Sequence, residues 1–295
     1  MNLSVLYRGK LTSCNYGCVY CPFAKRMESD ARLAEDRVGL LQFERWICEQ
    51  SMHRWRILFT PWGEALVRSW YRDTVSRLTH CEHIESVAAQ TNLSCGLEWL
   101  SDCHRSKLAL WVTFHPTEIK RSVFVRKVRR IQEAGVRLSV GMVGVPEFFP
   151  EIAALRQDLP PNIYLWINAQ QPRARSYTEE EIEFLNSIDP HFIKTSRPQP
   201  SMEKPCRTGH TSFTVDGEGA IRRCHFVDEV IGSIHQSDWE SRLFPRLCPN
   251  RACHCYLGLA HFALLELDNV FGDTLLERIP VQWADDVALA PASRR

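Results

Sequence analysis

The sequence lacks an excess of charge of either sign and any long hydrophobic run. Lysine and arginine total 36 against 35 aspartate and glutamate, so the formal net charge is +1 at pH 7. This balance does not predict a general attraction to nucleic acid or to anionic lipid. No stretch approaches the roughly 18 consecutive apolar residues needed to cross a bilayer. We therefore expect neither a nucleic-acid partner nor a membrane partner.

An export signal is also missing from the first residues. Residues 1–10 do not combine a basic start, an apolar segment and a small-residue cleavage site. We therefore expect a cytoplasmic protein, in which disulfides are rare and the 12 cysteines favour metal sites or clusters. Four cysteines without motif spacing are expected to be small buried side chains, namely Cys48, Cys81, Cys95 and Cys103.

Residues 1–195 alternate short apolar runs with longer amphipathic ones. This is the pattern of βα units around a parallel sheet, so we expect an α/β fold. Six strands are predicted, each followed by a segment that can form a helix. Their ranges are Leu3–Tyr7, Arg54–Thr60, Ser86–Gln90, Leu108–Phe114, Arg137–Val143 and Ile163–Asn168.

A helix start is specified after the sixth predicted strand. Thr178 and Glu181 have the spacing of a capping box, in which each side chain accepts a hydrogen bond from the backbone of the other residue. The sequence therefore predicts a helix that begins there and runs to about Ile188.

The chain is expected to divide at a proline-rich segment. Three prolines between residues 198 and 205 interrupt the βα pattern. We expect a parallel-sheet domain over residues 1–197 and a small cysteine-rich domain over residues 198–295. The second domain is expected to contain a β-hairpin and a C-terminal helix, and residues 288–295 are typical of a frayed tail.

Cys14, Cys18 and Cys21 follow the first predicted strand with C-x3-C-x2-C spacing, and Tyr20 precedes the last of them. Thiolates are the usual protein ligands of a [4Fe-4S] cluster, and three of them on one loop leave one iron open. A structural zinc site is the alternative. Zinc needs four protein ligands, however, and no further Cys or His occurs before Cys48.

This spacing resembles the signature of the radical S-adenosylmethionine (radical SAM) enzymes. The resemblance implies a partial (βα)6 barrel with the cluster loop after the first strand and ligands at the C-terminal strand ends. It implies that the amino and carboxyl groups of SAM chelate the open iron, with Tyr20 beside the adenine. An electron from the cluster would split SAM into methionine and a 5′-deoxyadenosyl radical that abstracts hydrogen from an unreactive carbon. A flavodoxin or ferredoxin is the expected electron donor.

Two further strand ends resemble SAM-binding motifs of the family. Gly63 and Glu64 resemble the end of a Gly-Gly-Glu motif whose glutamate accepts a hydrogen bond from the SAM ammonium, with Trp62 replacing the first glycine. Thr91 and Asn92 resemble a Thr-Asn-Gly segment that would bond the ribose or carboxylate of SAM. In both places a plain turn is the alternative.

The fifth strand leads into a segment that resembles the G-x-I-x-G-x-x-E motif of the family. Gly144 and Glu147 align with its glycine and glutamate. Met142 occupies the apolar position, which implies that its side chain packs on the adenine.

His115 follows the fourth strand and is the candidate catalytic side chain. A histidine there could touch substrate or move a proton, and a structural histidine is the alternative. Trp166, Asn168 and Gln170, at the sixth strand, are candidate pocket walls.

A second group of cysteines lies beyond the barrel. Cys206 and Cys224 bracket alternating apolar residues around Asp216–Gly219, which is a strong hairpin signal. The spacing resembles the C-x9-15-G-x4-C segment that opens the SPASM domain of peptide-modifying radical SAM enzymes. The chain has too few later cysteines for the two auxiliary clusters of that domain.

The shortened arrangement resembles a twitch domain with one auxiliary [4Fe-4S] cluster. We expect Cys206, Cys224, Cys253 and Cys255 as its ligands, with Cys248 as the alternative. Zinc is the competing metal, because four thiolates suit a tetrahedral Zn²⁺ ion equally well.

The resemblance favours a maturase that modifies a peptide or protein side chain. A radical SAM enzyme that acts on a small cofactor precursor or a sugar is the first alternative. The second alternative is a non-catalytic scaffold that holds zinc or a cluster.

Overall fold

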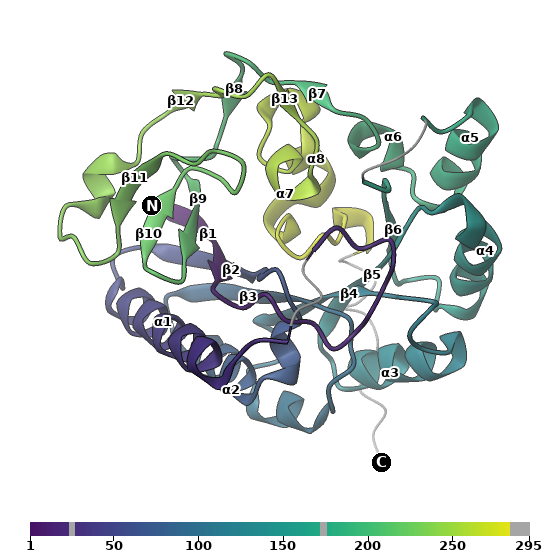
Figure 1. The fold of residues 1–295 in the computed structure, drawn as a ribbon, viewed down its shortest axis with the longest axis horizontal. Helices are drawn as coiled ribbons and strands as arrows, with labels where there is room; N and C mark the ends of the chain where they lie inside the picture. Colours follow the sequence, from purple (N-terminus) through teal and green to yellow (C-terminus); the bar gives the residue numbers. More distant parts are fainter. Residues whose placement is uncertain (24–26, 172–175, 284–295) are drawn as a thin grey trace.

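The computed structural model describes residues 1–23, 27–171 and 176–283. Six parallel strands are hydrogen-bonded in chain order, and helices connect most of them on one face of the sheet (Figure 1). The predicted α/β fold is thus confirmed. The strands are β1 (Asn2–Gly9), β2 (Arg54–Phe59), β3 (Ile84–Thr91), β4 (Leu108–Thr113), β5 (Arg137–Val143) and β6 (Leu165–Asn168).

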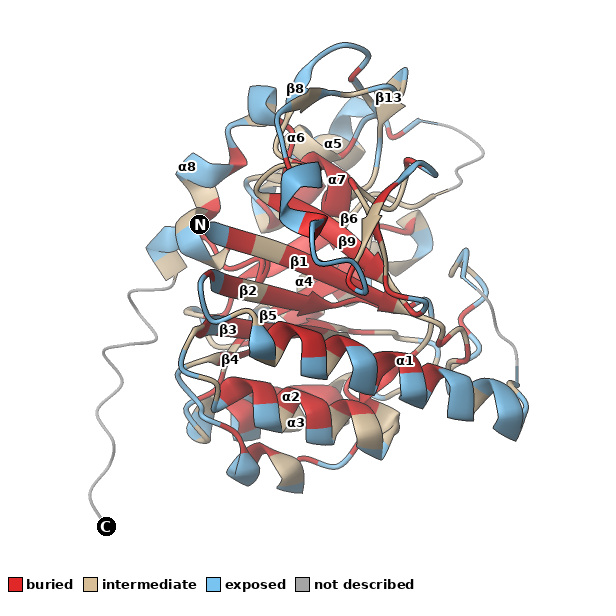
Figure 2. Ribbon diagram, turned by 90° about the vertical axis from the view of Figure 1, so that its left-hand side faces the viewer, coloured by how far each residue is buried: buried red, intermediate tan, exposed pale blue. Residues whose placement is uncertain are grey.

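The main helices bury one face against the sheet and expose the other. Figure 2 shows buried residues on the inner faces of α1 and α2 and exposed residues on their outer faces. Between β3 and β4 a short 3-10 helix, Glu98–Asp102, stands in place of an α-helix. The helices of this layer are α1 (Asp30–Glu49), α2 (Ser69–Thr79), α3 (Arg121–Glu133), α4 (Phe149–Asp158), α5 (Glu179–Ile188) and the short α6 (Phe192–Thr195).

The capping box forms at the start of α5. The backbone N–H of Glu181 donates to Thr178 Oγ1 at 3.2 Å, and the N–H of Thr178 donates to Glu181 Oε2 at 2.8 Å. These bonds satisfy amide groups that have no partner within the helix. The helix ends at Ile188, as the sequence predicts.

The predicted hairpin also forms, and it extends the main sheet. Strand β9 (Ser212–Asp216) pairs antiparallel with β10 (Ala220–Arg222) and parallel with β1, and β11 (Val230–Ser233) follows β10. Edge β1 is therefore covered, which leaves fewer unpaired backbone groups at this side. The division at residue 197 stays a prediction, although one sheet contains strands from both sides of it.

The rest of the C-terminal part is built from short elements. Two pairs of two-residue strands are joined antiparallel, β7 (Gln199–Pro200) with β13 (Ala252–Cys253) and β8 (Pro205–Cys206) with β12 (Arg246–Leu247). Helices α7 (Tyr256–Leu259) and α8 (Leu267–Phe271) follow. The expected frayed tail at residues 288–295 lies outside the described residues.

Two hydrophobic clusters lie on opposite faces of the sheet. The larger one fills the space between the strands and the outer helices. The smaller one joins inner-face residues such as Leu6, Leu58 and Trp111 to Tyr256 of α7 and Phe271 of α8. Helices α7 and α8 therefore lie across the inner face of the curved sheet (Figure 1). Within the described residues, no helix is both long enough and apolar enough to span a membrane.

Candidate cofactor and metal sites

The loop that carries the first three cysteines is packed against the turn after β2. The backbone N–H groups of Trp62 and Gly63 donate to Leu11 O at 3.2 and 3.3 Å, and that of Glu64 donates to Ser13 O at 3.0 Å. A Cβ at position 63 would lie 1.9 Å from Ser13 O. Gly63 is therefore required by the close approach of the chain's own backbone.

Glu28 fixes the same loop from its other side. Its Oε1 accepts hydrogen bonds from Thr12 N at 2.9 Å and Thr12 Oγ1 at 2.8 Å. Its Oε2 accepts from Ser13 N at 3.1 Å and Ser13 Oγ at 2.7 Å. Burial raises the pKa of Glu28, but these bonds outweigh it and hold the pKa below its ordinary value. The sequence analysis missed this residue, because a carboxylate beyond the cysteines carries no motif of its own.

Cys14 lies beside Asn92, at the end of β3. Asn92 Nδ2 donates to Cys14 Sγ at 3.8 Å and to Asn15 Oδ1 at 3.1 Å. The backbone N–H of Tyr16 also donates to Cys14 Sγ, at 3.5 Å. Burial raises the pKa of the Cys14 thiol, and these two donors lower it. A metal or cluster bound here would therefore displace the proton of the Cys14 thiol. The two N–H donors would then face the sulfur of the thiolate.

His115 lies against the second cysteine of the loop. Its Nδ1 is 3.3 Å from Cys18 Sγ and 3.0 Å from the Tyr20 hydroxyl. The Tyr20 ring stacks on the imidazole, with centroids 6.0 Å apart and an angle of 16° between the planes. Burial lowers the pKa of His115 to about 4 and raises that of Cys18 to about 11. His115 is therefore neutral at pH 7, and it orients the cysteine loop.

Glu64 lies at the centre of the strand-end residues expected to bind SAM. Its Oε1 accepts from Leu66 N at 3.1 Å and from Thr91 Oγ1 at 2.8 Å, and its Oε2 accepts from Asn92 N at 2.6 Å. Burial raises the pKa of Glu64 to about 7, against the lowering effect of these bonds. The structure thus brings Gly63, Glu64, Thr91 and Asn92 together beside Cys14.

Met142 and Gly144 have other neighbours. Met142 is buried in the larger cluster, between the sheet and the helices. The Tyr177 hydroxyl donates to Gly144 O at 2.6 Å, and a Cβ at Gly144 would lie 3.0 Å from the same hydroxyl. The expected packing of Met142 on adenine and the expected place of Gly144 in the SAM site therefore stay predictions.

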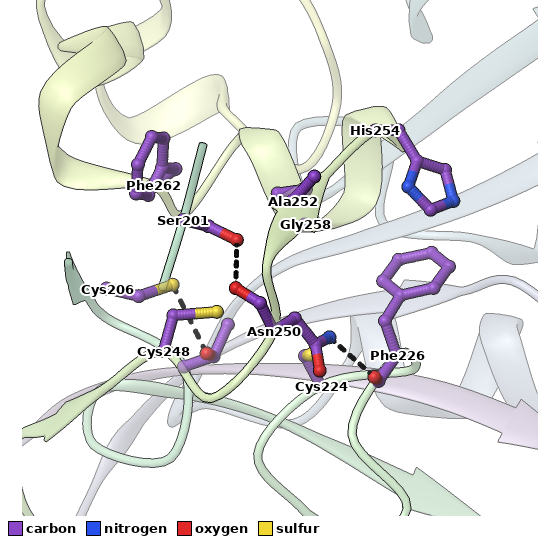
Figure 3. A pocket seen from close by; sticks show the side chains of 12 residues that line it. Ser201, Cys206, Cys224, Phe226, Cys248, Asn250, Ala252, His254, Gly258 and Phe262 are labelled. Carbon is purple, nitrogen blue, oxygen red and sulfur yellow. Dashed lines mark hydrogen bonds between the residues drawn. The ribbon is translucent and has the colours of Figure 1, made fainter. Parts of the chain in front are cut away.

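Four cysteines of the C-terminal part line one cavity (Figure 3). Cys206 comes from β8, Cys224 follows β10, Cys248 follows β12 and Cys253 comes from β13. The pairings of β8 with β12 and of β7 with β13 hold these segments together. Burial raises the pKa of Cys224 to about 11 and that of Cys253 to about 12. The thiols of Cys224 and Cys253 are therefore protonated at neutral pH unless a metal or cluster displaces the proton.

Cys255 is not among the residues that line this cavity. It packs instead against the cluster on the inner face of the sheet. Burial raises the pKa of its thiol, while the Leu257 N–H and the charges of Arg8 and Arg278 lower it. The arrangement therefore favours Cys248 over Cys255 as the fourth cysteine of the cavity.

The cysteine sets of both sites have the soft donors that iron–sulfur clusters use. Across residues 1–23, 27–171 and 176–283, no three Cys, His, Asp or Glu side chains are arranged as ligands of a single metal ion.

The four cysteines that lie outside both sites differ in burial. Cys95 and Cys103 are buried as expected, whereas Cys48 and Cys81 are half-buried, with their sulfurs 3.3 Å apart.

No protein-family model and no curated protein matches the sequence. Solved structures do match. The structure of anSMEcpe with bound AdoMet and the Cp18Cys peptide superposes with a TM-score of 0.57 at 14% identity, covering 99% of this chain and 92% of that one. The chain has the radical SAM fold.

A second match to the radical SAM fold is SuiB of Streptococcus suis bound to its precursor peptide SuiA. It has a TM-score of 0.56 at 13% identity and covers 82% of this chain and 65% of SuiB. The chain therefore spans about two thirds of the length of SuiB. At these identities the likeness extends to the fold, and the chemistry must be argued from the residues of this chain.

Proposed function

We propose that the protein is a radical SAM enzyme that cleaves SAM reductively at a [4Fe-4S] cluster held by Cys14, Cys18 and Cys21. The observation that carries this proposal is the position of the three cysteines. They follow β1 in a radical SAM fold, and Glu64 and Asn92 meet beside them at neighbouring strand ends.

When bound, the cluster supplies the electron that splits SAM, and the resulting 5′-deoxyadenosyl radical takes hydrogen from the substrate. The chain's own residues orient the cofactor. Glu64, once ionised, accepts a hydrogen bond from the SAM ammonium, and its burial strengthens that contact. Thr91 and Asn92 hold the carboxylate of Glu64 in place. His115 holds the Tyr20 hydroxyl, which keeps the ring of Tyr20 at the edge of the cysteine loop.

We further propose one auxiliary [4Fe-4S] cluster on Cys206, Cys224, Cys248 and Cys253. The cavity that these four line supports the choice, and so does Gly258, where a Cβ would lie 2.7 Å from Cys253 Sγ. A glycine there leaves room for the sulfur. Zinc on the same thiolates is the alternative.

For the substrate we propose a peptide or protein side chain. What supports this is the likeness to anSMEcpe and SuiB, both described with a bound peptide. A flavodoxin or ferredoxin in the cytoplasm is the proposed electron donor.

The test is SAM cleavage by the anaerobically reconstituted protein with dithionite. We expect formation of 5′-deoxyadenosine and methionine, and its loss in each of Cys14→Ala, Cys18→Ala and Cys21→Ala, since each change removes one ligand of the cluster. Cys103→Ala, a buried cysteine outside both sites, is the control and should retain cleavage. Undiminished cleavage in the three loop variants would contradict the proposal.

A further inference from the structure

Two arginine side chains are buried on the inner side of the sheet without an acidic partner. Arg8, near the end of β1, is 8% exposed, and Arg278, beyond α8, is 1% exposed. Among the described residues, neither forms an ion pair with a carboxylate. Removing a guanidinium from water costs several kcal/mol unless an anion compensates it, so this arrangement is unusual.

Arg8 is anchored by one of its three nitrogens. Its Nη1 donates to Thr60 O at 2.7 Å and contacts Thr60 Oγ1 at 3.3 Å, while Nε is buried without a partner. The guanidinium carbon lies 3.7 Å from the centre of the Trp62 ring. Burial lowers the pKa of Arg8 to about 10, so the group remains charged at neutral pH. Most of its hydrogen-bonding capacity is therefore unused.

Arg278 is held in a similar way. Its Nη1 donates to Asn168 Oδ1 at 2.7 Å, and its Nε is buried without a partner. The guanidinium lies against the rings of Tyr256, at 3.8 Å, and Trp166, at 4.3 Å. The aromatic faces compensate part of the buried charge, but they cannot accept its in-plane hydrogen bonds.

The backbone at Arg278 is strained. Its φ of 53° lies in the left-handed region, which is unfavourable for a residue with a Cβ. The neighbouring residue fixes the segment: Glu277 pairs with Arg137 at 2.8 Å, and Glu277 O accepts from Ser139 Oγ at 2.9 Å. Such strain persists where the surrounding structure imposes it, often at binding sites.

Among the residues that the structure describes, no carboxylate forms a hydrogen bond or an ion pair with either arginine. Asp189 is buried near the same strand, but it accepts hydrogen bonds from the Tyr164 hydroxyl, Ile167 N and His191 N, at 2.6 to 2.9 Å. Both arginines act on the thiol of Cys255, and Arg8 also acts on His225, whose Nε2 is buried without a partner.

We propose that Arg8 and Arg278 bind an anionic group of the substrate, a carboxylate or a phosphate, inside the barrel. The planar guanidinium fork matches both groups and forms paired hydrogen bonds with them. The inference rests on the proposed function only where it identifies the substrate as the molecule that carries the anionic group. For a peptide substrate, the group would be an acidic side chain or the C-terminal carboxylate.

The experiment titrates the reconstituted holoprotein with inorganic phosphate and, separately, with acetate, and follows the thermal unfolding midpoint. A ligand that binds only the folded state raises the midpoint in a saturable way. We expect saturation in the wild type and at least a tenfold weaker apparent affinity in Arg8→Met and Arg278→Met. Arg242→Met removes an exposed arginine that is paired with Asp238 and should behave like the wild type. The absence of a saturable effect in the wild type would overturn the proposal.

Two further arms keep the result interpretable. Arg8→Lys and Arg278→Lys retain the charge but lose the fork, so they should bind phosphate with intermediate affinity even if the methionine variants do not fold. The carboxylate of SAM is the other source of an anion. If saturating SAM abolishes phosphate binding, the arginines serve the cofactor and the substrate proposal is wrong; persistent binding with SAM present supports it.

Failure of the proposed function can be distinguished from failure of the anion-binding proposal. Phosphate binding needs no turnover, so Cys14→Ala should bind phosphate like the wild type while failing to cleave SAM. Wild-type protein that binds phosphate through both arginines but never cleaves SAM would contradict the radical SAM chemistry and leave the anion site standing.

Discussion

Glu64 shows how burial and hydrogen bonding oppose each other at a single residue. Three donors from neighbouring segments favour its ionised form, yet burial outweighs them and raises the pKa to about 7. Between the ordinary pKa near 4.5 and about 7, the folded protein binds a proton that the unfolded chain has lost. This group's contribution to stability is therefore present at low pH and lost as the pH rises through that window.

SAM binding should show the opposite dependence on pH. The ammonium of SAM prefers the ionised carboxylate, so we expect affinity for SAM to fall as the pH drops through about 7. Glu64→Gln should weaken binding at pH 8 by roughly 10- to 100-fold, the value of a charged hydrogen bond of about 1.5–3 kcal/mol. Isothermal titration of the reconstituted protein measures both effects.

The exposed Glu133 supplies the matched control for this measurement. Glu133→Gln should keep both the affinity and its pH profile. A Glu64→Gln protein that is folded, as judged by circular dichroism, and that binds SAM like the wild type would exclude Glu64 from the cofactor site.

At the scale of the elements, the cysteine loop after β1 and the turn after β2 act as one unit. Three backbone hydrogen bonds join residues 11–13 to residues 62–64, and Glu28 closes the loop from the far side. The parallel pairing of β1 with β2 brings the two segments to the same edge of the sheet. The chain's own secondary structure therefore positions the loop.

Gly63→Ala tests this docking. The new Cβ would meet the backbone of Ser13 at 1.9 Å, so the loop must move, at a cost of about 1–3 kcal/mol for overpacking. We expect the variant to lose about half of its iron, measured by iron analysis. We also expect it to lose SAM cleavage, measured by 5′-deoxyadenosine formation. Gly17→Ala lies on the same loop, where the nearest atom is 4.0 Å away, and should be tolerated. Equal behaviour of the two variants would contradict the docking argument.

At the scale of the whole molecule, the cysteine cavity is assembled from segments far apart in the chain. Its cysteines span residues 206–253, and their elements meet through the two short antiparallel pairings. Helices α7 and α8 meanwhile cover the inner face of the sheet, and Cys255, which precedes α7, packs against the cluster there. Cys253 and Cys255 are two residues apart, yet only Cys253 lines the cavity.

Iron content distinguishes Cys248 from Cys255 as a ligand. We expect about eight irons per chain, four for each cluster. Cys248→Ala should reduce the iron to about four, whereas Cys255→Ala should retain about eight. The reverse result would return Cys255 to the ligand set, and about four irons with one zinc in the wild type would show a zinc site.

Local patterns determined the sheet and its helices. Strand β5 has the predicted bounds, and the capping box at Thr178 sets the start of α5, because a short apolar run and backbone capping depend on neighbouring residues only. The spacing of Cys14, Cys18 and Cys21 likewise needs only one loop. The fold class could therefore be predicted from the sequence, and the cluster site on this loop stays a prediction.

The tertiary structure alone decided the rest. Glu28 contacts the cysteine loop, Cys255 packs on the inner face and Arg278 reaches Asn168, and none of these contacts follows from spacing along the chain. Each contact joins residues that are not neighbours in the chain, and for Cys255 and Arg278 it depends on how α7, α8 and the segment after them pack on the inner face of the sheet. The sequence therefore specified the α/β scaffold and the position of three cysteines after its first strand, while long-range packing selected which cysteines share a cavity and which arginines are buried without an acid.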